Sequence, residues 1–179
     1  MKAGTLPVVA TALTGTLALY IALVAFGNIT DFGTNQDFVR HVFAMDTTFK
    51  DEDLMWRAIG NETVADVAYV AIIVWETVAA LVLVAATVLW ARSLRHGDRG
   101  HERPRRASTL GLLMLLLLFG VGFLAIGGEW FAMWQSEKWN GTEAAARNFM
   151  FAGLTLILVH LPARTDTGTG TGTGTGSSS

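Results

Sequence analysis

Residues 66–91 read DVAYVAIIVWETVAALVLVAATVLWA, and their apolar side chains follow one another without the regular polar positions of a water-soluble helix or strand. The charged residues of the run are Asp66, at its start, and Glu76, inside it. A helix needs about 20 apolar residues to cross about 30 Å of hydrocarbon at a rise of 1.5 Å per residue. We therefore predict a membrane-spanning helix here.

Three further apolar blocks, at about 6–27, 109–132 and 143–161, have similar lengths. The last is the least apolar, because Arg147 and Asn148 lie in its first turns. We interpret the first block as a retained helix, since its apolar run is longer than the core of a signal peptide and no good cleavage site follows. The predicted fold is all-α: a polytopic membrane four-helix bundle over residues 1–164, with connecting loops at 28–65, 92–108 and 133–142.

The basic residues predict the orientation of these helices, because cytoplasmic loops are enriched in Lys and Arg. The 92–108 loop is rich in arginine, whereas the 28–65 and 133–142 loops hold most of the acidic residues. The arginines of the first loop are Arg92, Arg95, Arg99, Arg103, Arg105 and Arg106. We expect that loop and both chain ends to be cytoplasmic in the inner (plasma) membrane, and the arginines to contact anionic lipid rather than nucleic acid. Trp90 would then lie in an inner aromatic belt, and Trp56, Trp130, Trp134 and Trp139 in an outer one.

Several kinds of site are excluded or disfavoured by composition. The chain has no cysteine, so disulfides and thiolate chemistry are excluded. The four histidines have no metal-ligand spacing, and no phosphate loop, serine elbow or haem motif is present, so we expect no metal and no cofactor. Residues 165–179 repeat Thr and Gly and end in serine, a composition typical of a disordered tail.

The 28–65 loop is too long for a simple connection. Within it, residues 35–45 place Phe38, Val42 and Met45 on one helical stripe, and 53–59 offer a second short amphipathic segment. These segments could lie on the membrane surface or fold over the bundle as a cap. We favour the cap, because the loop returns to the same bundle.

A set of short motifs supports a family resemblance. They are NITDF at 28–32, FVRHV at 38–42, MDTTF at 45–49, WRAI at 56–59, Glu76, GEWFAMWQS at 128–136 and WNG at 139–141. With these motifs the chain resembles, from about Leu6 to Leu161, the bacterial family of predicted small integral membrane proteins of unknown function. The resemblance implies a four-helix membrane protein and supplies no activity, substrate or catalytic residue.

Glu76 is the residue that best suggests a site, because a carboxylate in mid-membrane is costly. Tyr69 shares its helix face, and Tyr20 and Asn148 are expected at about its depth, as hydrogen-bond partners. These four residues form a predicted intramembrane polar site. Glu76 could bind a proton or cation, or could be a neutral acid that joins two helices.

A second predicted cluster lies on the outer face and consists of His41, Asp46, Glu129 and Arg147. Glu129 and Arg147 are expected to form a structural ion pair, with Arg147 reaching outward along the helix end. The sequence leaves open whether His41, Asp46 and Glu129 converge under the cap. The spacing Asp46-Thr47-Thr48 also suits a simple turn.

Two functional hypotheses follow. The first is a non-enzymatic protein that binds a membrane protein partner, or serves as an accessory subunit or sensor, through its outer cap. The second is a small proton- or cation-coupled transporter or channel-like protein that uses Glu76 and would need a homo-oligomer, since four helices make a thin pathway. A membrane enzyme is a weaker alternative, because no catalytic constellation is present. Beyond the lipid bilayer, the sequence identifies no partner.

Overall fold

The computed structural model describes residues 5–96 and 101–161, and this part of the chain is helical with no β-strand. Five α-helices and three shorter or wider helical segments follow one another. They are α1 (Thr5–Thr30), α2 (Phe32–Ala44), η1 (Met55–Arg57), α3 (Glu62–His96), α4 (Glu102–Leu116), η2 (Leu117–Trp130), η3 (Met133–Gln135) and α5 (Thr142–His160). The tail at 165–179 and the loop residues 97–100 lie outside the described residues.

Three of these helices are long and apolar enough to cross a membrane: Thr5–Thr30, Glu62–Arg95 and Glu102–Trp130. The third is a continuous rod in which α4 passes into the π-helical segment η2 without a break. α5 is shorter and carries Glu143, Arg147 and Asn148 in its first two turns, and it is not among the three. The predicted all-α membrane fold is therefore confirmed for three spans by length and composition.

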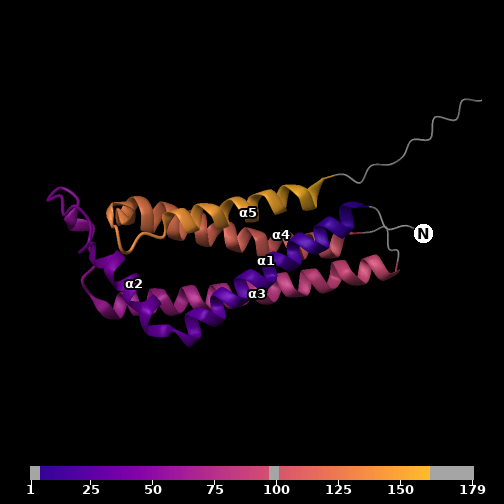
Figure 1. Ribbon diagram of the computed structural model, residues 1–179, viewed down its shortest axis with the longest axis horizontal. Helices are drawn as coiled ribbons and strands as arrows, with labels where there is room; N and C mark the ends of the chain where they lie inside the picture. The colour runs from indigo at the N-terminus through magenta and orange to yellow at the C-terminus, as the bar shows by residue number, and fades with distance from the viewer. Residues whose placement is uncertain (1–4, 97–100, 162–179) are drawn as a thin grey trace, which may run out of the picture.

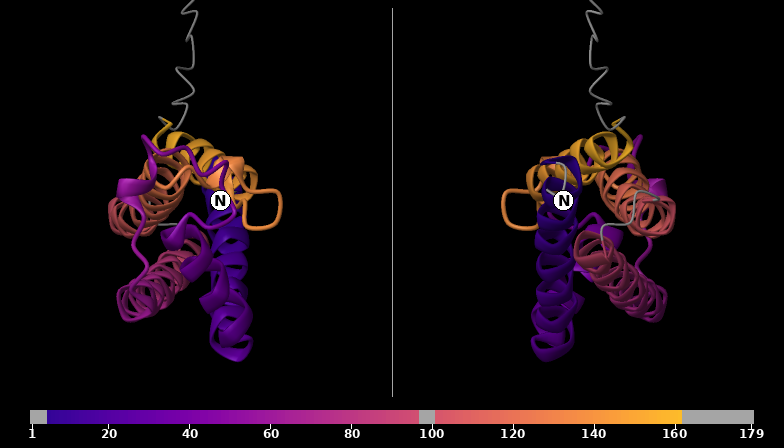
Figure 2. Two further views of the ribbon diagram at one scale, coloured as in Figure 1. Left: turned by 90° about the vertical axis from the view of Figure 1, so that its left-hand side faces the viewer. Right: turned by 90° about the vertical axis from the view of Figure 1, so that its right-hand side faces the viewer.

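The four long rods lie side by side (Figure 1). α1 packs on α3, α3 on α4, and α5 on both α4 and η2. Viewed along the long axis, α1 is tilted relative to the other rods and runs down one side of the group (Figure 2). The first turns of α1 and the last turns of α5 lie at one end, where Ala10, Trp90 and Val159 form a small buried cluster. We call the opposite end, which carries α2, η1 and η3, the capped end.

Small residues bring the rods close together. Ile21, Leu83 and Leu112 are completely buried between α1, α3 and α4. A Cβ atom on Gly111 would lie 2.6 Å from Leu83 Cγ, so only glycine permits this approach of α4 to α3. The outward faces of the rods are apolar and exposed, as at Leu81 and Ile157. Such a surface suits lipid rather than water.

α2 covers the capped end. Val42 and Met45 pack with Phe131 and Met133 in a buried cluster, while Val39 packs against α3 near Tyr69. The amphipathic helix expected at 35–45 is therefore formed as the later part of α2, which ends at Ala44 with Met45 as its C-cap. The second segment, expected at 53–59, forms only one 3₁₀ turn, Met55–Arg57. This prediction was wrong because the backbone N–H groups of Leu54 and Met55 bond to the Asp51 carbonyl, which closes a turn instead of starting a helix.

Candidate functional site

Glu76 lies about halfway along α3 and is only 2% exposed. Its Oε2 atom accepts a hydrogen bond of 2.7 Å from Asn28 Nδ2, in the last turn of α1. The Asn28 backbone carbonyl in turn accepts a bond of 2.8 Å from the Tyr69 hydroxyl. Tyr69 and Glu76 are two helical turns apart on one face of α3, so both reach the same end of α1. The result is a short polar chain that joins α1 to α3.

This polar chain forms one wall of a cavity of about 240 Å³. Tyr20, Asn28 and Asn35 come from the first part of the chain, Tyr69 and Glu76 from α3, and Asn148 from α5. The structure therefore brings the four residues of the predicted intramembrane site, Tyr20, Tyr69, Glu76 and Asn148, to one cavity. The other lining side chains are apolar and include Phe119 and Phe123.

The expected hydrogen-bond partner of Glu76 was wrong. Tyr20 and Asn148 line the cavity, but Glu76 accepts its hydrogen bond from Asn28 instead. The reason is that α1 does not end at Gly27 and runs on to Thr30, which carries Asn28 to the depth of Glu76. A signal was present: Asn28 continues the inward spacing of Thr14, Ala18, Ile21 and Ala25 by one further step.

The chemistry of this cavity follows from its charges. Glu76 is the only carboxylic acid among the lining residues, and none of them is Lys, Arg or His. A carboxyl group away from water is either protonated and neutral, or ionised and stabilised by a cation or by several hydrogen-bond donors. Asn28 supplies one such donor. The rest of the stabilisation that the carboxyl group requires can come from a proton or from a positively charged ligand in the cavity.

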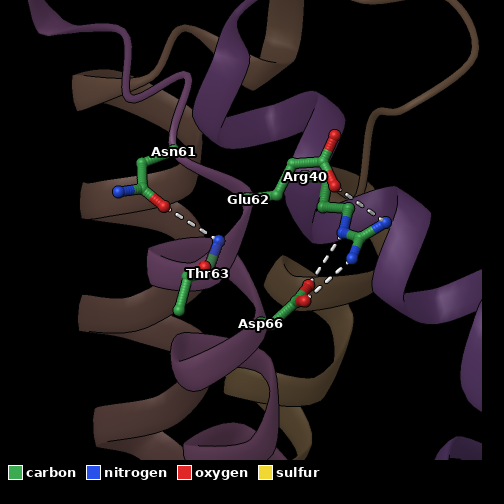
Figure 3. A network of polar contacts seen from close by, with 5 residues as sticks. All are labelled: Arg40, Asn61, Glu62, Thr63 and Asp66. Carbon is green, nitrogen blue, oxygen red and sulfur yellow. Dashed lines mark hydrogen bonds and ion pairs between the residues drawn. The ribbon is translucent and has the colours of Figure 1, made fainter.

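A second polar group fastens α2 to α3 at the capped end (Figure 3). Arg40 donates from Nε and Nη2 to the two carboxylate oxygens of Asp66, at 2.7 and 2.8 Å, and its Nη1 lies 3.4 Å from Glu62. The hydrogen bond that Arg40 donates to the Asp66 carboxylate raises the pKa of Arg40 above its ordinary value. Asn61 begins α3 beside this group by accepting the Thr63 N–H at 2.9 Å, as an N-cap does. Sequence reasoning missed this pair, because residues 26 positions apart give no local pattern.

The predicted outer-face cluster is only partly assembled. His41 Nδ1 lies 2.7 Å from Asp46 Oδ2, and the His41 ring stacks on Trp139 with centroids 4.7 Å apart. His41 and Asp46 border a cavity of about 230 Å³ that is also lined by Arg40 and Glu62. Glu129 and Arg147 do not join them.

The ion pair expected between Glu129 and Arg147 is not formed among the described residues, and that expectation was wrong. Gly127 and Gly128 are buried, so η2 turns Glu129 outward to solvent. Arg147 is likewise exposed, next to the buried Asn148. The described residues also contain no group of three acidic or histidine side chains placed to hold a metal ion.

Trp90 does not lie in an aromatic belt. It is 1% exposed, and its Nε1 donates a bond of 2.9 Å to Ser108 Oγ, which lies 3.5 Å from Thr14 Oγ1. The belt interpretation was wrong because a buried partner hydroxyl on α4 satisfies the indole N–H. This group joins three helices far from Glu76.

Comparison with known families agrees with these features. Residues 6–162 match the family described as predicted small integral membrane protein (DUF2165). The chain belongs to this family. For the DUF2165 protein described here, the match confirms an integral membrane protein with transmembrane helices and provides no molecular function. No curated protein and no solved structure matches the chain.

Proposed function

We propose that this DUF2165 protein is a non-enzymatic membrane protein that binds a cation, or a proton, at Glu76. The observation that supports the proposal is a 2% exposed carboxyl on the wall of a cavity that has no basic side chain. Asn28 donates a hydrogen bond to the acid, and no residue lining the cavity carries a positive charge. A role for Glu76 in joining helices explains the Asn28 bond, but it does not explain the adjoining space.

The topology that we propose with this site has four crossings. α5 runs beside α4 and η2 and ends near the start of α1 (Figure 1). Its buried Asn148 faces the cavity, while the exposed Arg147 can extend toward the headgroups of the capped end. Four crossings put both chain ends on one side. The arginine-rich 92–108 segment makes that side cytoplasmic, and the capped end then faces outward.

The test is cation-dependent stability of the protein purified in detergent. A ligand that binds only the folded state raises the midpoint of thermal unfolding as its concentration increases. We expect a saturable increase with at least one of Na⁺, K⁺ and methylammonium, measured against an equal concentration of the bulky cation N-methylglucamine. Glu76→Gln should fold normally and lose the increase. Equal responses of the wild type and Glu76→Gln to every cation and to a change of pH would refute the proposal.

Coupled transport is a further possibility for the same site, and it would require an oligomer. The measurement that distinguishes it is uptake of the cation by proteoliposomes, once binding has been established. A protein that binds the cation without moving it acts as a sensor or accessory subunit.

One observation supports the accessory role. Four aromatic side chains are exposed at the capped end and pair edge to face: Phe49 with Trp134, and Trp56 with Trp130. Trp56 is 69% exposed and Phe49 is 73% exposed. Such residues are enriched in protein interfaces and at membrane surfaces. Purification in mild detergent tests this role: a stoichiometric partner lost in a Phe49→Ala, Trp56→Ala variant supports it, whereas self-association alone contradicts it.

A further inference from the structure

A second cavity, of about 270 Å³, lies beside the Glu76 cavity. It is bounded by α3 and η2 and covered by α2, and all the side chains that line it are apolar. Phe38, Val39, Ile72 and Phe123 line both cavities, so these four residues form the partition between them. A carboxyl in one compartment therefore has an apolar compartment directly next to it.

The apolar cavity exists because two rods separate near the capped end. α3 packs on α4, whereas η2 packs on α5. The facing positions carry small residues, Ala68 and Ala71 on α3 and Gly122 and Gly127 on η2. Ala71 and Ile126 line the cavity and are also exposed, so it opens sideways on the apolar surface of the rods. In a bilayer, this opening faces the hydrocarbon.

The chemistry of the two compartments defines the ligand class. Glu76 favours a positive charge, and an anionic headgroup would be repelled there. An ammonium group also supplies several N–H donors, which suits Glu76, the amide oxygens of Asn28 and Asn148, and the Tyr20 hydroxyl. The rings of Phe119 and Phe123 suit a cation too. The adjoining cavity offers only apolar contacts, which suit a hydrocarbon chain.

We propose that the two cavities form one site for a lipophilic amine, with the protonated amine at Glu76 and the hydrocarbon chain between α3 and η2. This inference rests on the proposed function and specifies the ligand class of that site. The two volumes together fall within the range of about 300–1,000 Å³ that is usual for small-molecule sites. The ligand enters from the bilayer through the lateral opening, and the side chains of Phe38 and Phe123 move aside to admit its chain.

The experiment compares ligands that share either an eight-carbon chain or an ammonium group. The protein is reconstituted in lipid nanodiscs, and unfolding midpoints are measured against octylammonium, methylammonium, octanol and octanoate. We expect octylammonium to bind at least about tenfold more tightly than methylammonium, because each buried methylene adds to the affinity. Octanol and octanoate should give no saturable effect that depends on Glu76.

Variants separate the two compartments. Gly122→Leu should fill the apolar cavity and reduce octylammonium affinity to that of methylammonium, which should itself be unchanged. A Cβ on Gly122 meets only Leu118 Cδ1, at 3.9 Å, so the change should be tolerated. Gly153→Leu is the matched control outside the cavity, where a Cβ meets Leu116 Cδ2 at 3.8 Å. If Gly122→Leu fails to fold, Ala71→Leu serves the same purpose.

The outcomes are distinguishable. If methylammonium binds through Glu76 and the octyl chain adds nothing, the lipophilic site is refuted and the proposed cation site stands. If octanol binds as well as octylammonium, and Glu76→Gln changes neither, the cavity holds neutral lipid and the inference fails. If neither amine binds, no inorganic cation binds and Glu76→Gln leaves the pH dependence of stability unchanged, the proposed function fails as well.

Discussion

Glu76 is a carboxyl whose two possible roles respond differently to the same substitution. Gln keeps the shape of Glu and can still accept the hydrogen bond from Asn28 Nδ2, but it cannot become charged, nor can it take up or release a proton. We expect Glu76→Gln to leave the free energy of unfolding nearly unchanged and to abolish cation-dependent stabilisation. SDS titration in mixed micelles measures the first quantity and thermal unfolding with cations the second.

Glu76→Leu is the companion change. It removes the acceptor and leaves the partly buried Asn28 amide without its partner. We expect a loss of about 0.6 to 2 kcal/mol, the range for hydrogen bonds between membrane helices. A leucine variant as stable as the wild type would show that the Asn28 bond adds nothing to the fold.

The packing of α4 on α3 depends on a single glycine. A Cβ on Gly111 would lie 2.6 Å from Leu83 Cγ and 2.7 Å from Leu83 Cδ2, and Leu83 is completely buried. We expect Gly111→Ala to lower the free energy of unfolding by about 1–3 kcal/mol, as overpacking does. Gly153→Ala, on α5, is the control: its Cβ would make an ordinary contact, and helix propensity favours alanine by about 0.5–1 kcal/mol. The same SDS titration compares the two, and equal effects would contradict the close contact.

α2 is held to α3 by the Arg40–Asp66 pair, so the pair should govern how firmly the cap is docked. We expect Arg40→Ala and Asp66→Ala each to increase hydrogen exchange in α2, and the double variant to add little to either single one. Arg40→Lys should recover only part of the protection, because an ammonium group cannot bond both carboxylate oxygens in the fork geometry. Additive effects of the two alanine variants would show that the residues act independently.

At the scale of the molecule, the prediction concerns sidedness. We expect the C-terminus and residue 99 to be cytoplasmic and Asp51 and Lys138 to be outside, because arginine is concentrated in the 92–108 segment. Reporter fusions at the C-terminus, and labelling of single cysteines introduced at the other three positions, measure this. The cysteine-free chain supplies a clean background for the labelling. A C-terminus found outside, together with a cytoplasmic residue 99, would exclude α5 as the fourth crossing.

The sequence alone was enough to predict the all-α membrane fold and the family. Length, apolarity and the MDTTF and GEWFAMWQS motifs are local properties, and a bilayer allows little besides helices for such segments. The same reasoning identified α2 as an amphipathic helix and Glu76 as a residue whose burial needs an explanation. It also put Tyr20, Tyr69 and Asn148 near Glu76, because depth along a rod follows from counting residues.

Only the tertiary structure decided which side chains meet. The depth of a residue does not fix how each helix is rotated about its own axis. The sequence therefore could not show that Asn28, rather than Tyr20 or Asn148, bonds to Glu76. Nor could it show that Arg40 meets Asp66, that Trp90 turns inward to Ser108, or that Glu129 and Arg147 are both exposed. The apolar cavity beside Glu76 arises from the separation of α3 and η2, which have different packing partners. Such features depend on contacts between residues far apart in the chain, and no local pattern specifies them.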